Sequence, residues 1–283
     1  MTTVDFITEL FCRVDDAMQQ EPGYAHKHSQ AKLYPSEVVT LAMLFALKGV
    51  SNRAFYRWVE RDLLPLFPGM PERTRLFRLF ATHHRWTTRF LAEPTVLGLA
   101  DTLGIQLLHP RRARRSPNQI GRFGISNHVW IVGGKLCVVL NKWGLVCGWD
   151  CSTANVHDTT FHPLIKSFEE RMIVVSDHGF YSAQGTQGYG RRRRKQWAEP
   201  NCANPSNLLI SRVDGWNSRM LVETVFSMLT GVCHLKRMGH RVWRYFQAHL
   251  AYAVALFNLL VQWNGLSADE HGFVHLSIAQ FSL

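Results

Sequence analysis

Three acidic residues in this sequence stand where carboxylates could act together on a metal ion. Asp101 follows the apolar run 96–100, and Asp177 follows the apolar run 172–176. Short apolar runs of this kind predict buried strands, and a strand end presents its side chain to a ligand while the backbone stays fixed. Glu223 lies later, on a predicted helix whose neighbouring residues are apolar. The three acids are therefore candidates for a shared site.

Carboxylates that lie close together repel one another unless cations neutralise them. Two Mg²⁺ ions about 4 Å apart would do so, activating a water or a 3′-hydroxyl on one side of a phosphorus and stabilising the leaving oxygen on the other. Mg²⁺ also retains water and phosphate oxygens, so it needs few protein ligands. The pattern indicates phosphoryl transfer. Each acid taken alone also fits a turn or an exposed helix position, so three unrelated structural acids remain the alternative.

Four segments resemble the conserved blocks of bacterial insertion-sequence DDE transposases, which belong to the RNase H-like superfamily. Three of them hold the acids: Ala100-Asp101-Thr102, the segment 176–180 and the segment 219–227. The fourth, 154–158, lies between the first two acids, as a conserved block does in that family. The segments follow the order of the family, and the resemblance covers nearly the whole chain.

The resemblance implies an α/β protein with an RNase H-like mixed-sheet catalytic domain and an all-α N-terminal domain. It implies that Asp101, Asp177 and Glu223 are both the catalytic residues and the ligands of Mg²⁺ or Mn²⁺, two ions in all. The substrate would be double-stranded DNA, cut at terminal inverted repeats and joined to target DNA through the freed 3′-hydroxyls. Because transposition joins two ends, a homodimer on DNA is expected.

Arg219 precedes Glu223 by one helical turn, so both side chains face the same way. We expect Arg219 to contact a phosphate or to orient the glutamate, with a surface ion pair as the alternative. Trp216, three residues earlier, would stack on a base or simply pack.

The elements that must position these residues begin with a helical region, residues 1–95, which we expect to bind DNA. Helical spacing of apolar residues predicts helices over 4–20, 36–48, from Ser51 onward and over 71–91, with a short turn at 49–51. Four arginines, with no acid among them, fall in one sector of the last helix: Arg75, Arg78, Arg85 and Arg89. A helix–turn–helix followed by such a helix suits DNA binding. The alternative is an exposed, solvated face.

Strand patterns follow in a predicted catalytic domain, residues 96–240. A strand over 96–100 ends at Asp101, strands 128–132 and 135–141 flank the tight-turn pair Gly133-Gly134, and a strand over 145–150 follows. A helix over 161–170, the strand 172–176 and a helix over 218–235 complete this domain, in which residues 183–211 predict an exposed insertion. Residues 241–283 are expected to form a C-terminal helical extension, with a helix over 242–263. Asp158 is expected to cap the helix near Phe161 or to form a turn rather than to bind metal.

Charge favours a polyanionic partner. Lys and Arg number 32 against 21 Asp and Glu, which gives a net charge of +11. The loop 110–122 contains five arginines and no acid, follows the strand of Asp101, and is expected to contact phosphates: Arg111, Arg112, Arg114, Arg115 and Arg122. A basic membrane-surface protein is the alternative, but the longest apolar run, 250–261, is too short to span a bilayer.

The N-terminus lacks the features of a signal peptide, so we expect a bacterial cytoplasmic, nucleoid-associated protein with no membrane partner. The six cysteines form no CxxC pair and predict reduced thiols rather than a zinc site. No histidine is assigned to a metal. Two rival functions stay open: a structure-directed nuclease on the same fold, and a transposase-derived DNA-binding protein that has lost catalysis.

Overall fold

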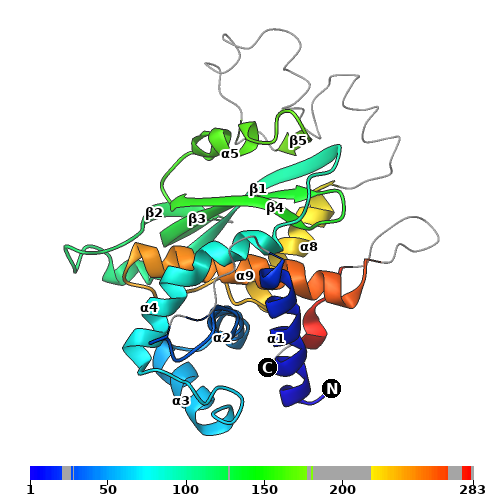
Figure 1. Cartoon of the computed structure of the whole chain (residues 1–283). Helices are drawn as coiled ribbons and strands as arrows, with labels where there is room; N and C mark the ends of the chain where they lie inside the picture. Colours follow the sequence, from blue (N-terminus) through cyan, green and yellow to red (C-terminus); the bar gives the residue numbers. More distant parts are fainter. Residues whose placement is uncertain are drawn as a thin grey trace. The chain divides into compact units, whose positions relative to one another are not determined.

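The computed structural model describes residues 1–20, 27, 29–126, 128–176, 180, 218–266 and 276–281, except the side chains of Ser218 and Arg219. The protein is a mixed α/β molecule with N-terminal helices, a five-stranded mixed sheet and C-terminal helices (Figure 1). The chain forms two compact units. The first comprises Met1–Phe90, Leu229–Trp263 and Ile278–Leu283, and the second comprises Leu91–Met228 and Asn264–Ser277.

The first unit is built from helices. These are α1 (Thr3–Gln19), α2 (Pro35–Lys48), α3 (Asn52–Asp62), α4 (Arg73–His83), a 3-10 helix (His84–Phe90), α9 (Trp243–Asn264) except its last residue, and a short 3-10 turn (Ala279–Phe281). The predictions for the first three helices and for α9 are confirmed. A capping box starts α1, because the Thr2 hydroxyl accepts from the Asp5 amide and the Asp5 carboxylate accepts from the Thr2 amide.

Helix α2 is the centre of this unit, since eleven of its residues are buried. It ends at Gly49, whose φ of +61° favours glycine, and the Ser51 hydroxyl then caps α3 by accepting from the Ala54 amide. The two helices are bent by 118°. This geometry confirms the predicted turn at 49–51 and falls in the range of helix-turn-helix units.

Aromatic contacts and buried hydrogen bonds join the helices of the first unit. The Phe45 ring of α2 lies against rings on α3, α4 and α9, namely Phe55, Phe77, Phe80 and His249. From α9, the Tyr252 hydroxyl donates to the Phe80 carbonyl (2.9 Å) and the Asn258 amide donates to the Phe90 carbonyl (2.8 Å). Buried Asn258 is thus satisfied, as a buried polar group must be.

The second unit contains the sheet. Its strands are β1 (Leu97–Leu108), β2 (Arg122–Ser126), β3 (Val129–Asn141), β4 (Val146–Thr153) and β5 (Ile173–Ser176). The order is β2-β3-β1-β5, and β4 pairs with the second half of β3 (Figure 1). β1 is antiparallel to β3 and parallel to β5. Helix α5 (His162–Lys166) and α8 (Ser218–Gly231, of which Ser218–Met228 belong to this unit) complete it.

A core cluster covers one face of this sheet. It combines small and aliphatic residues of the strands with aromatic residues near α5: Ala100, Cys137, Val139, Cys147, Phe161, Ile165, Phe168, Met172, Val174 and Phe180. The described cysteines are all free thiols, as expected. Burial raises the pKa of Cys147 and of Cys233 to about 12, so neither is a thiolate at neutral pH.

Two strand predictions are wrong in extent. β1 does not end at Asp101 but continues to Leu108, because its residues keep pairing with β3 over the whole length. Residues 128–141 are not two strands with a tight turn, because Gly133 and Gly134 lie inside the continuous strand β3. The hairpin in this region instead joins β2 to β3.

Three helix predictions are too long. The predicted helix 71–91 changes at His84 from α4 to a 3-10 helix, and there the ring nitrogens of His83 and His84 meet the carbonyls of Leu79 and Ala81. The helix near Phe161 is a 3-10 turn (Asp158–Phe161) followed by the short α5. Helix α8 stops at Gly231 rather than at 235.

The predicted insertion 183–211 lies outside the described residues. Among the helices that are described, no single one is long and apolar enough to cross a membrane. The bent pair α2–α3 satisfies that test by length and composition alone.

Candidate functional site

Asp101 lies in the middle of β1, and the parallel strand β5 runs beside it. The register places Ala100 opposite Ser176, and these are the residues that directly precede Asp101 and Asp177 in the chain. Asp101 is partly exposed, and its Oδ1 accepts from the Thr102 amide at 2.6 Å. Asp177 itself lies outside the described residues. The described part of the site is thus the pair of strands that leads to the two aspartates.

Negative charge gathers around the middle of β1. Burial raises the pKa of the Cys137 thiol well above its usual value, and the nearby charges of Asp101, Asp158 and Asp150 raise it further. Cys137 of β3 pairs with Thr102 of β1 on one side and with Asp150 of β4 on the other, so these three side chains share one face of the sheet. Asp101, the neighbour of Thr102, faces the opposite side.

Asp158 is held beside β1 by a lysine that the sequence did not single out. Its Oδ1 accepts from Lys135 Nζ at 2.8 Å and from Thr102 Oγ1 at 3.1 Å. Lys135 Nζ also donates to the Val156 carbonyl at 2.8 Å. Of the two expected roles of Asp158, the cap is wrong, because His157 caps the 3-10 turn, and the turn is confirmed, because Asp158 is the first residue of that turn. A lysine inside an otherwise apolar strand was the signal that could have revealed the pair, since such a charge needs a partner.

Glu223 lies on α8 with its side chain exposed, although Val222 and Val225 beside it are buried. Leu221 and Val225 approach Gly144 in the turn between β3 and β4, so the apolar side of α8 packs there and the glutamate faces outward. The backbone of Arg219 belongs to the same helix, but its side chain is outside the described set.

The described residues include two of the three predicted metal ligands, Asp101 and Glu223. Within the described ranges, no three His, Cys, Asp or Glu side chains are grouped so that they could hold a metal ion. The described part of the chain therefore does not bring the predicted triad together, and its third member, Asp177, falls in a gap. The triad stays a prediction.

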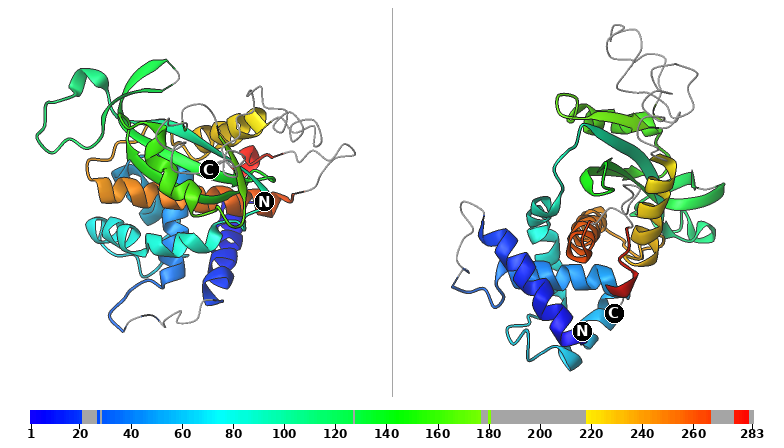
Figure 2. Two further views of the ribbon diagram at one scale, coloured as in Figure 1. Left: turned by 90° about the horizontal axis from the view of Figure 1, so that it is seen from above. Right: turned by 90° about the vertical axis from the view of Figure 1, so that its right-hand side faces the viewer.

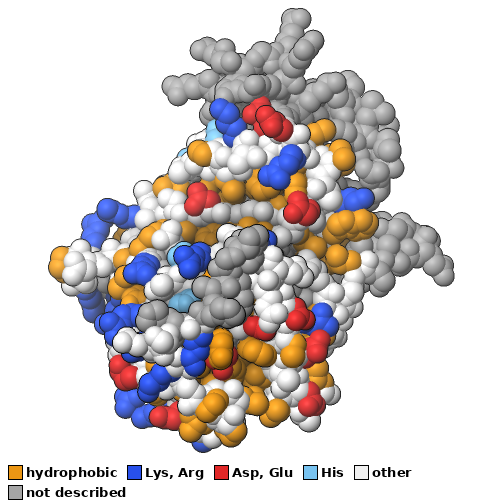
Figure 3. Space-filling model, in the orientation of Figure 1, with side chains coloured by type: hydrophobic (Ala, Val, Ile, Leu, Met, Phe, Trp, Pro, Cys, Tyr) orange, Lys and Arg blue, Asp and Glu red, His pale blue; other side chains and the backbone are white. Residues whose placement is uncertain are grey.

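The loop that follows β1 carries its arginines on the surface. Arg111, Arg112, Arg114 and Arg115 are all exposed, and Pro110–Arg112 form a 3-10 turn capped by His109. The sequence has no Asp or Glu from Thr102 to Trp149, so the nearest acid before these arginines is Asp101 in the middle of β1, and neither β2 nor β3 carries one. In Figure 3, blue basic and orange apolar side chains lie next to one another at the left, over the β2–β3 end of the sheet. An anionic partner fits such a surface.

The four helical arginines do not act as one continuous stripe. Arg75 and Arg78 are on α4, whereas Arg85 and Arg89 are on the 3-10 helix that follows. Arg75 and Arg85 line a cavity of about 310 Å³, and Arg78 and Arg89 do not. The α-helical wheel assumed in the prediction fails after His83, because a 3-10 helix has three residues per turn.

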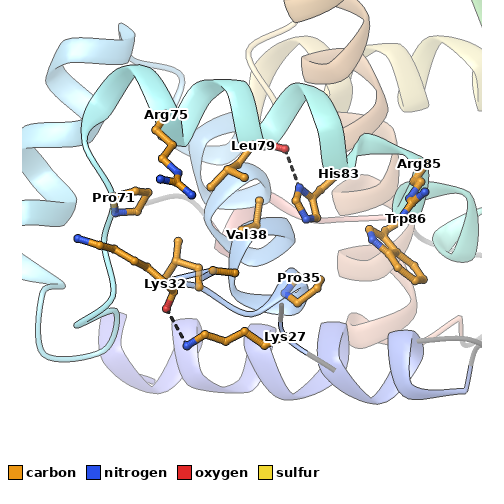
Figure 4. A pocket seen from close by; sticks show the side chains of 12 residues that line it. Lys27, Lys32, Pro35, Val38, Pro71, Arg75, Leu79, His83, Arg85 and Trp86 are labelled. Atoms are coloured by element: carbon orange, nitrogen blue, oxygen red, sulfur yellow. Dashed lines mark hydrogen bonds between the residues drawn. The ribbon is translucent and has the colours of Figure 1, made fainter. Parts of the chain in front are cut away.

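The cavity is basic, and none of the described residues that line it is a carboxylate (Figure 4). It is lined by Lys27, Ala31, Lys32, Leu33, Pro35, Val38, Pro71, Arg75, Leu79, His83, Arg85 and Trp86. Lys27 Nζ donates to the Lys32 carbonyl at 3.1 Å and lies 4.8 Å from the centroid of the Tyr34 ring. The volume and the positive charge of the cavity suit an anionic group such as a phosphate.

His83 adds a neutral group to this cavity. Its Nδ1 lies 3.0 Å from the Leu79 carbonyl, so this nitrogen carries the proton and Nε2 is an acceptor. Burial lowers the pKa of His83, and the nearby Arg85 lowers it further. The positive charge of the cavity at neutral pH therefore comes from its lysines and arginines.

Arg244 of α9 is a basic residue of this region that sequence reasoning missed. Its Nη2 donates to the Ala81 carbonyl (3.4 Å) and to Thr82 Oγ1 (3.3 Å), so it joins the surface between Arg78 and Arg85. No local pattern could have indicated this contact, because the partners are more than 160 positions apart.

Sequence comparisons give no match to any protein-family model or curated protein.

Proposed function

We propose that this chain is a DDE transposase with an RNase H-like catalytic domain. It would bind terminal inverted repeats and carry out metal-dependent cleavage and strand transfer of double-stranded DNA, acting as a homodimer. The observation that carries the proposal is the pairing of Ala100 with Ser176 on parallel neighbouring strands. It supports the proposal because two chain segments with transposase-like motifs, 76 positions apart, meet at the residues just before their aspartates.

The residues proposed to hold Mg²⁺ or Mn²⁺ are Asp101, Asp177 and Glu223. The two that are described fit oxygen ligation of such ions, because the Asp101 side chain is partly exposed and the Glu223 side chain is exposed. The bound ions would supply the charge that activates the attacking oxygen and stabilises the leaving oxygen.

The other residues would position the DNA and the acids. Lys135 neutralises Asp158, and Thr102 donates to that same carboxylate, which fixes Asp158 beside β1, on the face of the sheet opposite to the Asp101 side chain. The exposed arginines 111, 112, 114 and 115 would contact phosphates and so place the duplex without reading its sequence. Arg75, Arg78, Arg85, Arg89 and Arg219 are proposed to make further phosphate contacts.

A cleavage and strand-transfer assay tests this proposal. A labelled duplex carrying the terminal sequence that flanks the gene is incubated with Mn²⁺ and target DNA. We expect the wild type to nick at the repeat and to join the end to the target. Asp101→Asn and Asp177→Ala should still bind but should cut at least about 100-fold more slowly, since removing a metal ligand removes several kcal/mol of transition-state stabilisation.

Asp150→Asn is the matched control, because this exposed aspartate faces the opposite side of the sheet from Asp101 and should leave cleavage unchanged. Cleavage without joining would favour the structure-directed nuclease. Binding without cutting by the wild type and both variants would favour a catalytically inactive descendant.

A further inference from the structure

The end of the β2–β3 hairpin exposes more large apolar surface than the sheet it extends. Four side chains stand out by the fraction that is exposed: Phe123 37%, Ile125 57%, Val129 62% and Trp130 60%. The same strand β3 is fully buried a few residues later, from Leu136 to Leu140. Exposed apolar side chains grouped in this way mark an interaction site more often than a solvated surface.

The pairing register separates these side chains into two faces. Ile125 pairs with Trp130 and Phe123 pairs with Val132, so Phe123, Ile125 and Trp130 share one face, while Val129 lies on the other. On the face of Val129, a Cβ added to Gly124 would meet the Ala154 carbonyl at 2.1 Å, so the backbone near Ala154 already covers that side. The face of Trp130 is the more open one.

Positive charge borders this open face. The Arg114 guanidinium lies 5.9 Å from the centroid of the Phe123 ring, a cation–π contact that joins the arginine loop to the hairpin. The hairpin and the loop before it project from the sheet (Figure 2), and the sequence has no acid from Thr102 to Trp149. Charge complementarity therefore selects a polyanion as the occupant. A second copy of this chain, with a net charge of +11, would bring like charges together.

Aromatic side chains beside arginines bind nucleic acid best where its bases are unpaired. In a duplex the faces of the bases are covered by their neighbours, whereas a single strand offers them for stacking on an aromatic ring while its phosphates meet the arginines. An indole that is 60% exposed near the end of a two-stranded hairpin is available for such stacking.

We propose that Phe123, Ile125, Trp130 and Arg114, here called the Trp130 surface, bind an unpaired segment of DNA, with a base stacked on Trp130. The inference rests on the proposed function for the identity of the polyanion. It adds that this hairpin distinguishes single-stranded from double-stranded DNA, as is needed where a strand end is opened or frayed during cleavage.

A binding assay with the full chain, in EDTA so that no DNA is cut, tests the inference. Two labelled probes share one duplex sequence: one is blunt and the other carries a ten-nucleotide single-stranded tail. We expect Trp130→Ala to weaken binding of the tailed probe about 10-fold and binding of the blunt probe less than 2-fold. Trp130→Phe should retain most of the tail preference, because an aromatic ring remains.

Val129→Ala is the matched control, since Val129 is equally exposed but lies on the opposite face, and it should leave both affinities unchanged. A second measurement does not depend on any variant. Under ultraviolet light, a tail that contains 5-iodouracil should form a crosslink to Trp130. Mass spectrometry of the digested protein locates the crosslinked residue.

Equal losses on both probes, no loss on either, or crosslinks confined to other residues would overturn the inference. Loss of self-association by Trp130→Ala with DNA binding unchanged would assign the surface to a second copy. If Trp130→Ala lost only its binding to phosphatidylserine vesicles, the surface would be assigned to a membrane. Either of these two results would contradict the inference. The proposed function can be tested separately from this inference. If cleavage depends on Asp101 but Trp130→Ala leaves the preference for the tailed probe unaltered, this inference alone is refuted.

Discussion

Lys135 and Asp158 form a partly buried ion pair in the second unit. Their side chains are 15% and 20% exposed, and Nζ and Oδ1 are 2.8 Å apart. Because few waters screen such a pair, removing one partner leaves a poorly solvated charge behind. The Arg61–Asp62 pair differs, since both side chains are well exposed and solvent screens their attraction.

Lys135→Met should therefore lower the free energy of unfolding by about 1–3 kcal/mol, because among the described residues Asp158 then keeps only the Thr102 hydroxyl as a partner. Urea unfolding followed by circular dichroism measures this change. Arg61→Met, the control, should leave the urea midpoint close to that of the wild type. Equal midpoints for the two variants would show that the partly buried pair contributes no more than the exposed one.

At the scale of elements, β3 connects the parts of the second unit. Its first half pairs with β2, its second half pairs with β4, and β1 lies along its other side. Gly133 sits at the crossover, paired with Arg122 on one side and with Gln106 on the other. A Cβ at Gly133 would lie 1.8 Å from the Ile105 carbonyl oxygen, so this residue lets two backbones approach closely.

Gly133→Ala should destabilise the protein by at least about 1–3 kcal/mol, because the clash is with backbone atoms that cannot rotate away. Urea unfolding measures this, and hydrogen exchange should locate the loosened amides in β1 and β3. Gly231→Ala is the control, since a Cβ there meets no atom within 4 Å at the end of α8. A stable Gly133→Ala variant would mean that β1 is displaced there at little cost.

At the scale of the molecule, positive charge is distributed unevenly along the chain. The net charge is +11, yet from Thr102 to Trp149 the chain carries five arginines, two lysines and no acid. Cationic side chains that bind phosphates release counterions from DNA, so the number of phosphates bound can be measured from the dependence of affinity on salt. The salt dependence of variants can therefore distinguish phosphate contacts made by the loop before β2 from those made by the helical region.

Replacing Arg111, Arg112, Arg114 and Arg115 together by Gln should reduce the slope of log affinity against log salt by up to about 3.6, which is about 0.9 for each phosphate that the protein no longer neutralises. Fluorescence anisotropy between 50 and 200 mM salt measures it. The control replaces Arg13 and Arg61, which already pair with Glu9 and Asp62, and should leave the slope unchanged. An unchanged slope in the loop variant would exclude this loop from the DNA interface.

Local signals in the sequence were sufficient for several elements and for part of the site. Helix α1 follows from periodicity, and α2 and α3 follow from apolar residues together with the terminator Gly49 and the cap Ser51, since a cap acts within one turn of its helix. The position of β5 and the clustering of arginines in the loop after β1 were also readable, because both depend on residue types that are close together in the chain.

Tertiary structure alone decided the remaining features, because each depends on groups far apart in sequence. Pairing with β3 carries β1 past Asp101, and close packing against β1 makes Gly133 a strand residue instead of a turn residue. The Lys135–Asp158 pair and the approach of Arg244 to Thr82 likewise span long separations. Local propensity could not predict them, because each depends on a hydrogen bond or close packing that forms only when the chain has folded.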